Sequence, residues 1–127
     1  NYRAFGHALG MAYQVRDDIL GIWGESDRTG KPSGEDILAR KKTLPVVIGM
    51  AHSPEFRALY RSTAGEDILD VRNAVRMLQE CGARAAAEDV ERAQVDIALS
   101  RLTAAGPVGK AGEALRALAQ LLLERTD

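Results

Sequence analysis

Cysteine is almost absent from this sequence, since Cys81 is the only one among 127 residues. A single thiol cannot form a disulfide within the chain, and it cannot by itself build a cysteine-based zinc site. Nothing in the sequence therefore calls for an oxidising compartment. We expect the protein to work in a reducing one, and we predict a cytoplasmic location.

The sequence also lacks an excess of one charge and a long apolar run. The 17 Lys and Arg residues nearly balance the 18 Asp and Glu residues, so no global field would attract nucleic acid. No apolar run is long enough for an integral membrane segment, and no signal-peptide pattern precedes the first helix. The chain begins with Asn1 inside a helical pattern, so we expect a fragment of a longer protein.

Strand-like alternation is the third absence. Apolar residues recur every three or four positions instead, which predicts an all-α fold, a helical bundle. Pro45 predicts a break near Thr43 and Leu44, and Ser53-Pro54 is typical of a helix start. We expect helices over residues 2–23, 36–51 with that break, 54–62, and three more after residue 67. The apolar faces of these last three are predicted to be Ile68, Val71, Val75 and Leu78, then Ala86, Val90, Ala93 and Ile97, then Ala111, Leu115, Leu118 and Leu122.

The first predicted helix, residues 2–23, is apolar nearly all round, which indicates a position inside the fold. On a helical wheel its most apolar side carries Ala8, Ala12, Val15, Ile19 and Ile22. The polar side chains share one narrow stripe, which consists of His7, Gln14, Asp17, Asp18 and Gly21. Arg16 falls on the apolar side, where we expect it to reach solvent or to find a partner.

Asp17 and Asp18 place two adjacent carboxylates in the otherwise apolar run "AYQVRDDILGIWG". Two neighbouring buried acids are tolerated if they share a proton, pair with a basic side chain or bind a divalent cation. Mg²⁺ prefers carboxylate oxygens and often binds one or two of them together with substrate phosphates. Two alternatives to a metal site are that the polar stripe faces solvent, or that Arg3 or Arg16 neutralises the two carboxylates.

Basic residues follow this acid pair along the chain. Residues 24–36 are rich in Gly and polar residues and read as a loop, which contains Lys31. Lys41 and Lys42 follow on the next predicted helix. Lysines close to a Mg²⁺ site suit a diphosphate, because both cations would oppose the same anionic oxygens. The sequence does not contain the spacing of a P-loop.

The order of these motifs resembles one known family. "GMAYQVRDDILGIWG" followed by "TGKPSGEDILARKKTLPVV" is similar to the C-terminal half of the trans-type polyprenyl diphosphate synthases, which include farnesyl and geranylgeranyl diphosphate synthases. The resemblance covers residues 6–47. It implies that residues 1–127 are a C-terminal helical fragment of the isoprenoid synthase (class I terpenoid synthase) fold, with no second domain.

The resemblance implies a Mg²⁺-dependent prenyl transfer between an allylic diphosphate and isopentenyl diphosphate. Asp17 would be the direct metal ligand and Asp18 a supporting acid. Gln14 would orient the departing diphosphate, and Lys31 and Lys41 would neutralise it. Thr43 and Asp36 belong to the same matched motif, where Thr43 is expected to contact substrate. The family also implies a homodimer of the full-length protein.

Two departures from the family pattern qualify this expectation. The second aspartate-rich motif of the family is usually Asp-Asp-x-x-Asp, but Gly21 stands at its fifth position, and this loss could weaken Mg²⁺ affinity. The first aspartate-rich motif does not occur in these residues. We therefore expect the fragment to be inactive alone and its parent to be active. The alternatives are a non-catalytic relative of the same fold, a class I terpene cyclase, and a helical bundle with a surface acid pair.

Overall fold

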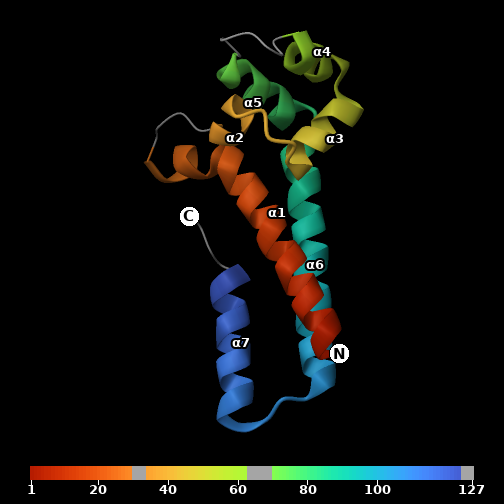
Figure 1. The fold of residues 1–127 in the computed structure, drawn as a ribbon, viewed down its shortest axis with the longest axis vertical. Helices are drawn as coiled ribbons and strands as arrows, with labels where there is room; N and C mark the ends of the chain where they lie inside the picture. The colour runs from red at the N-terminus through yellow and green to blue at the C-terminus, as the bar shows by residue number, and fades with distance from the viewer. Residues whose placement is uncertain (30–33, 63–69, 124–127) are drawn as a thin grey trace. The chain divides into compact units, whose positions relative to one another are not determined.

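The computed structural model describes residues 1–29, 34–62 and 70–123. Within these ranges the chain is helical and forms no strand, which confirms the all-α prediction. The helices, shown in Figure 1, are α1 (Tyr2–Thr29), α2 (Glu35–Leu38), α3 (Leu44–His52), α4 (Pro54–Ser62), α5 (Val71–Glu80), α6 (Ala83–Ala105) and α7 (Gly109–Leu123). In the described part of the chain, no helix has both the length and the apolar composition that a membrane crossing needs.

The predicted break between α2 and α3 is confirmed. Residues 39–43 leave the helical conformation, and α3 starts at Leu44 with Pro45 in its first turn, where a proline costs no hydrogen bond. The start of α4 is also as predicted, because the Ser53 hydroxyl accepts a hydrogen bond from the Phe56 N–H at 3.1 Å. Gly82, at φ 83°, takes the left-handed turn that separates α5 from α6.

The end of the first helix was predicted wrongly. α1 continues past Gly24 to Thr29, and α2 begins at Glu35, so these parts of the expected loop over residues 24–36 are helical, whereas residues 30–33 lie outside the described residues. Gly24 does not adopt a positive φ, and it is buried against the side chain of Leu20. A glycine ends a helix only where the backbone turns left-handed, and Gly24 instead provides space for a close neighbour.

The chain divides into two compact units, and each is described here by itself. The first unit consists of residues 1–17 and 89–126, so it contains the first part of α1, most of α6 and α7. Its core is a cluster of small and medium side chains with Leu9 and Leu115 packed at its edge; the cluster members are Phe5, Ala8, Ala98, Leu102 and Ala119. Three of these five side chains are alanines.

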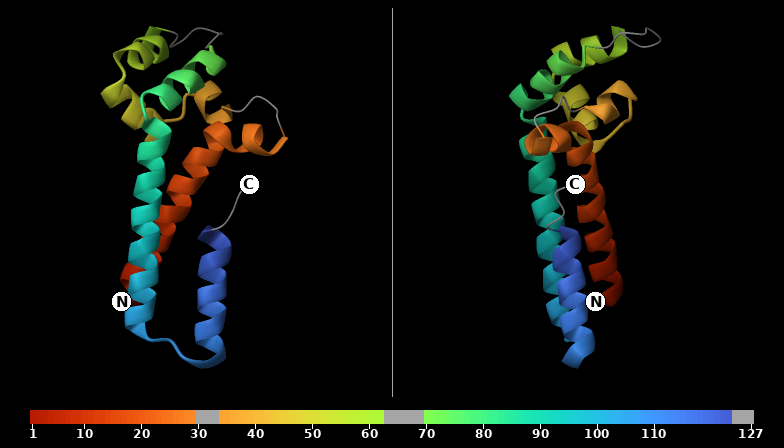
Figure 2. Two further views of the ribbon diagram at one scale, coloured as in Figure 1. Left: turned by 180° about the vertical axis from the view of Figure 1, so that it is seen from behind. Right: turned by 90° about the vertical axis from the view of Figure 1, so that its left-hand side faces the viewer.

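The second unit consists of residues 18–88. Figure 2 shows its short helices gathered together, with α3 packed on α4 and α5, and α5 also against α2. Its core contains larger side chains, all of them at most 4% exposed: Ile22, Trp23, Ile37, Val46, Phe56 and Leu78. This unit contains Asp18, the second acid of the adjacent pair. It also contains residues 39–43 between α2 and α3, which include Lys41 and Lys42 and are called the lysine segment below.

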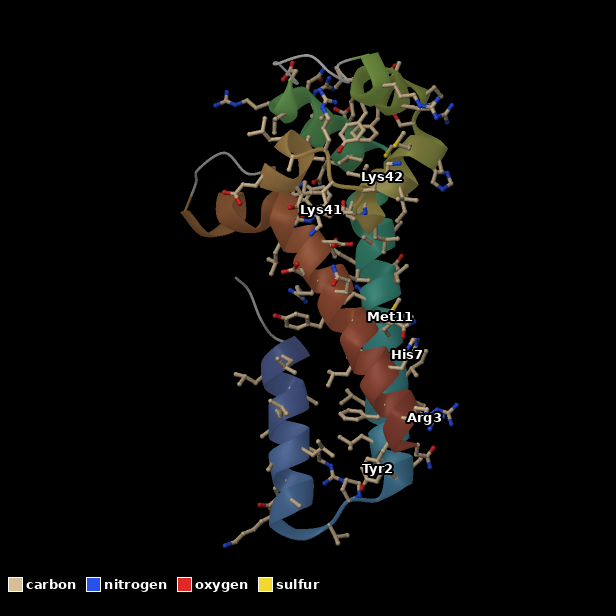
Figure 3. All side chains as sticks on the ribbon, viewed as in Figure 1. Tyr2, Arg3, His7, Met11, Lys41 and Lys42 are labelled. Atoms are coloured by element: carbon tan, nitrogen blue, oxygen red, sulfur yellow. The ribbon has the colours of Figure 1, made fainter. Side chains whose placement is uncertain are left out.

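The predicted apolar side of α1 is confirmed, since each of its five residues is at most 6% exposed. The expectation that this helix lies inside the fold is wrong for four residues on its other side. Tyr2, Arg3, His7 and Met11 follow one exposed side of α1 (Figure 3), with Tyr2 at 53% and Met11 at 42% exposure.

The apolar face predicted for α6 is also wrong. Val90 and Ile97 are 37% and 43% exposed, and Ala93 is exposed as well. The buried side of α6 carries Ala83, Ala87, Glu91, Ala98 and Leu102 instead. In α7, Leu115 and Leu122 of the predicted face are half-buried, whereas Ala111 and Leu118 are exposed. Ile68, predicted for the α5 face, lies outside the described residues.

Candidate functional site

The two acids of α1 have different environments although they are adjacent in sequence. Asp18 is only 8% exposed, whereas Asp17 is half-buried. Successive side chains leave an α-helix about 100° apart, so the two carboxylates point in different directions. Asp18 can therefore make contacts within the fold while Asp17 remains partly exposed.

Asp18 caps the N-terminus of α3. The Leu44 N–H donates a hydrogen bond to Asp18 Oδ2, with a donor–acceptor distance of 3.0 Å. Leu44 is the first residue of α3, where backbone N–H groups lack partners within the helix and a negative charge is favourable. The burial of this acid therefore has a structural explanation, because the carboxylate satisfies a helix terminus.

Thr43 occupies the N-cap position of α3, but its side chain makes no capping hydrogen bond. The residue is 2% exposed, and its hydroxyl oxygen has no hydrogen-bond partner among the described residues. A threonine at this position commonly caps its own helix. Here Asp18 takes that role, and the Thr43 hydroxyl lies buried beside the segment predicted to bind substrate.

The lysine segment between α2 and α3 is held by α4. Arg40 adopts φ 56°, an uncommon conformation for a residue other than glycine. Its guanidinium donates to the Tyr60 carbonyl at 3.1 Å and lies 5.9 Å from the centre of the Tyr60 ring. The Tyr60 hydroxyl in turn donates to the Lys41 carbonyl at 3.4 Å. These contacts fix the backbone from which Lys41 and Lys42 extend.

Tyr60 is 7% exposed and its ring stacks on Phe56, with ring centres 5.2 Å apart. Burial raises the pKa of the Tyr60 phenol. The nearby Arg40 charge opposes this shift, and Asp36 adds to it. Because the phenol is neutral at ordinary pH, Tyr60 acts here as a hydrogen-bond donor. Its role is to position the lysine segment.

Lys41 and Lys42 are both exposed, as Figure 3 shows on the segment that joins α2 to α3. Lys41 Nζ lies 3.9 Å from Asp36 Oδ2, and the Lys41 side chain remains 51% exposed. The same Asp36 carboxylate lies against α1 at Gly21, in the space that a side chain at residue 21 would occupy. Lys31, the other predicted phosphate-binding lysine, lies outside the described residues.

Arg16 was one of two arginines considered as partners of Asp17 and Asp18, but it pairs with a different acid. Its guanidinium forms a two-point ion pair with Glu91 of α6, at 2.5 and 3.0 Å. Glu91 is 8% exposed, so this ion pair is largely shielded from water on the α6 side. Gln14, the remaining predicted site residue, is exposed on α1 two turns after His7.

The donor set fits a divalent cation that takes part of its ligands from substrate. Within residues 1–29, 34–62 and 70–123, no group of three or more His, Cys, Asp or Glu side chains forms a metal site by itself. Asp17 and Asp18 offer hard carboxylate oxygens, and the exposed lysines offer cations for an anionic ligand. Mg²⁺ suits such a site, because it commonly binds through one or two carboxylates and completes its octahedral shell with phosphate and water.

Comparison with known proteins identifies the family of this chain. Residues 1–80 match the polyprenyl synthetase family, so the chain belongs to that family. Over 125 residues it is 36% identical to the geranylgeranyl diphosphate synthase of Mycobacterium tuberculosis, covering 95% of this chain and 35% of that protein. It is 40% identical over 86 residues to a (2E,6E)-farnesyl diphosphate synthase of the same organism, covering 68% of this chain and 20% of that protein.

Solved structures show the same fold. A polyprenyl synthetase from Streptomyces coelicolor superposes with a TM-score of 0.83 at 31% identity, covering 94% of this chain and 38% of that one. Geranylgeranyl pyrophosphate synthase from Corynebacterium glutamicum, complexed with calcium and isoprenyl diphosphate, superposes with a TM-score of 0.72 at 32% identity. This match covers 97% of this chain and 38% of that one. The fold is therefore that of the isoprenoid synthases. The chain spans about a third of the length of the relatives it matches over most of its residues.

Proposed function

We propose that these residues are the C-terminal part of a chain-elongating prenyl diphosphate synthase, which joins an allylic diphosphate to isopentenyl diphosphate. The family membership supports this proposal, as do relatives named for geranylgeranyl and farnesyl diphosphate synthesis. A relative at 32% identity is complexed with calcium and isoprenyl diphosphate, which is the ligand chemistry expected for paired acids and lysines. A homodimer in the cytoplasm is part of the same proposal.

One observation carries the assignment of the site. The hydrogen bond from Leu44 N–H to Asp18 joins the acid-bearing helix α1 to the segment that presents Lys41. The hydrogen bond thereby connects the acid pair, proposed to bind a divalent cation, to a backbone position three residues after Lys41, which is proposed to bind the diphosphate.

In this proposal each residue acts on the diphosphate of the allylic substrate. Asp17 would hold Mg²⁺ directly with Asp18 in support, and the metal would stabilise the charge that develops on the leaving diphosphate. Lys41 binds the diphosphate oxygens, and Lys31 is proposed for the same role. Gln14 orients the leaving group, and Thr43 is the remaining residue that we propose for substrate binding, through a hydroxyl that is buried in the structure without substrate.

The reaction itself balances without another reactant. The carbon–oxygen bond of the allylic diphosphate breaks, and the double bond of isopentenyl diphosphate attacks the resulting carbocation. A new carbon–carbon bond forms, and the product loses one proton. Preorganised charges around the departing diphosphate provide most of the acceleration, because they stabilise negative charge without reorganising.

The decisive experiment is Asp17→Asn in the protein that contains these residues. We expect the turnover number to fall by roughly 100-fold or more, as for loss of one electrostatic stabiliser. Mg²⁺ affinity, measured by calorimetry in the presence of inorganic diphosphate, should fall as well. Asp96→Asn, at an exposed acid on α6, is the matched control and should change neither quantity.

The competing functions give different results. A non-catalytic relative would bind diphosphate with Mg²⁺ but would show no turnover, and a bundle with an idle acid pair would be unaffected by Asp17→Asn. The isolated 127-residue chain should be inactive with both substrates, since we propose that it provides half of the site. Turnover by this chain alone would contradict that part of the proposal.

A further inference from the structure

The lysine segment contains three consecutive basic residues, and the first of them is held differently from the other two. Lys41 and Lys42 are exposed, whereas Arg40 is half-buried and has φ 56°. The Arg40 guanidinium lies against Tyr60 of α4, with a hydrogen bond to the Tyr60 carbonyl. The three positive charges are therefore not one uniform cationic surface.

Arg40 ends α2 in a Schellman motif, the common turn that follows a helix. Its N–H donates to the Ile37 carbonyl at 3.0 Å. The N–H of Lys41 donates to the Asp36 carbonyl at 2.9 Å, which completes the hydrogen-bond pair of this motif. The residue that turns left-handed here is usually glycine, because a Cβ atom crowds the following carbonyl oxygen. An arginine at this position needs other contacts to offset that crowding.

Tyr60 provides contacts on both sides of the turn. Its carbonyl accepts from Arg40 Nη1 at 3.1 Å, and its ring centre lies 5.9 Å from the guanidinium carbon. Its hydroxyl donates to the carbonyl of Lys41 at 3.4 Å. The ring is buried and stacks on Phe56, so the partner is itself well held. Tyr60 therefore contacts both Arg40 and the backbone of Lys41.

We infer that Arg40 and Tyr60 are positioning residues, which hold the left-handed turn that directs Lys41, and that Arg40 does not itself bind the diphosphate. This role rests on the proposed function, in which Lys41 binds the diphosphate oxygens. A long, flexible lysine binds more tightly when its backbone is already in place, because less freedom is lost on binding. Loss of the turn should therefore weaken diphosphate binding more than it slows the chemical step.

Three substitutions of Arg40 separate backbone conformation from charge. Glycine accepts the left-handed conformation but removes the charge, whereas lysine keeps the charge but lacks the planar group that lies against the Tyr60 ring. Alanine loses both. In the protein that contains these residues, calorimetry measures the affinity for inorganic diphosphate at a fixed Mg²⁺ concentration. Steady-state kinetics gives KM and kcat for the allylic diphosphate.

We expect Arg40→Ala and Arg40→Lys to weaken diphosphate binding by roughly 10-fold, because a displaced group can cost up to about 100-fold. Arg40→Gly should stay within about threefold of the unsubstituted protein, since it keeps the turn. KM should follow the same order while kcat changes by less than about threefold, as for lost ground-state binding. If Arg40→Ala fails to fold, the comparison of glycine with lysine still decides.

The opposite order would overturn the inference. A diphosphate-binding Arg40 would tolerate lysine, and its replacement by glycine would be as harmful as replacement by alanine. Equal affinities in all three variants would also reject the positioning role. Arg61→Ala removes the charge of an exposed residue in the last turn of α4 and is the control, which should bind diphosphate normally.

Tyr60→Phe tests the other half of the turn. It keeps the ring against Arg40 but removes the hydroxyl that donates to the Lys41 carbonyl. Diphosphate binding should weaken by roughly 2–10-fold, the usual effect of one hydrogen bond. The effect should be larger when Arg40→Gly is also present, because the two residues hold the same turn. Independent effects of the two substitutions would contradict a shared role.

Lys41→Gln in the same assays distinguishes this inference from the proposed function. Weak diphosphate binding in Lys41→Gln, together with normal binding in Arg40→Ala and Tyr60→Phe, would reject only the positioning role. Normal binding in Lys41→Gln would reject the proposed function of Lys41, and the positioning role would be rejected with it.

Discussion

The Leu44 N–H of α3 donates a hydrogen bond to the Asp18 carboxylate of α1 at 3.0 Å. This contact supplies the cap that Thr43, the N-cap residue of α3, does not provide with its own side chain. Of two adjacent acids on one helix, Asp18 thus holds the fold together. Asp17, half-buried beside it, is the one we propose for metal binding.

Asp18→Ala should lower the free energy of unfolding by about 1–2 kcal/mol, the usual cost of losing an N-cap acceptor. Asp18→Asn should cost less, because an amide oxygen can still accept from Leu44 N–H. Urea unfolding followed by circular dichroism measures both values. Asp96→Ala, at an exposed acid of α6, is the control, and equal stability of Asp18→Ala and the control would contradict the capping role.

The Arg16–Glu91 ion pair should couple strongly in a double-mutant cycle. The side chains are 30% and 11% exposed, so water screens the pair only in part. We expect a coupling energy of about 1–3 kcal/mol from Arg16→Met, Glu91→Gln and their combination.

The ion pair between Arg92 and Asp89 of α6 is the exposed comparison, with one contact at 2.9 Å and exposures of 70% and 71%. Its coupling should be below about 1 kcal/mol, as for exposed ion pairs. Similar coupling energies for the two pairs would show that burial does not strengthen the Arg16–Glu91 interaction.

Tyr60 should make the protein less stable at alkaline pH. Burial raises the pKa of its phenol in the folded state, so the folded protein retains this proton at a pH where the unfolded chain has lost it. The resulting stability is fully present below about pH 10, the ordinary pKa of tyrosine, and is lost as pH rises through the higher folded value.

Unfolding experiments between pH 8 and pH 11 measure this effect. Tyr60→Phe removes the ionising group and should flatten that part of the pH dependence relative to the unsubstituted protein. Tyr2→Phe changes a tyrosine that is 53% exposed and serves as the control. An unchanged slope above pH 10 in Tyr60→Phe would contradict the assignment.

Two helical glycines should respond in opposite directions to alanine. A Cβ at Gly49 would overlap Leu78 and lie 3.2 Å from a Phe56 ring carbon, whereas a Cβ at Gly10 would meet nothing within 4 Å. Gly49→Ala should therefore destabilise the fold by about 1–3 kcal/mol through overpacking. Gly10→Ala should stabilise it by roughly 0.5–1 kcal/mol, because alanine restricts the unfolded chain. Thermal unfolding of both variants checks the signs.

Local features of the fold could be predicted from the sequence. The buried side of α1, the break before Leu44 and the start of α4 each depend on periodicity, proline or a capping residue within a few positions. Such signals do not depend on the rest of the chain. The family resemblance also identified the fold, because its motifs are spaced along one continuous segment.

Features that depend on contacts between distant residues were missed. In α6, alanines occur on several sides of the helix, so hydrophobic periodicity does not single out the side that carries Ala87 and Ala98. Glu91 is buried on that side because Arg16, 75 positions earlier, neutralises it. The cap on Leu44 and the approach of Asp36 to Gly21 likewise join separate elements. The one available signal was Gly21 itself, an unexplained glycine within a helix.

The alanine-rich core of the first unit determines how that unit can be studied. Alanine scanning, the usual way to locate core residues, would find nothing at Ala8, Ala98 or Ala119, because these positions are already alanine. The informative scan is the reverse one, in which each is enlarged to valine or leucine. Since Ala8, Ala98 and Ala119 are at most 1% exposed, added carbon atoms would have to displace neighbouring side chains.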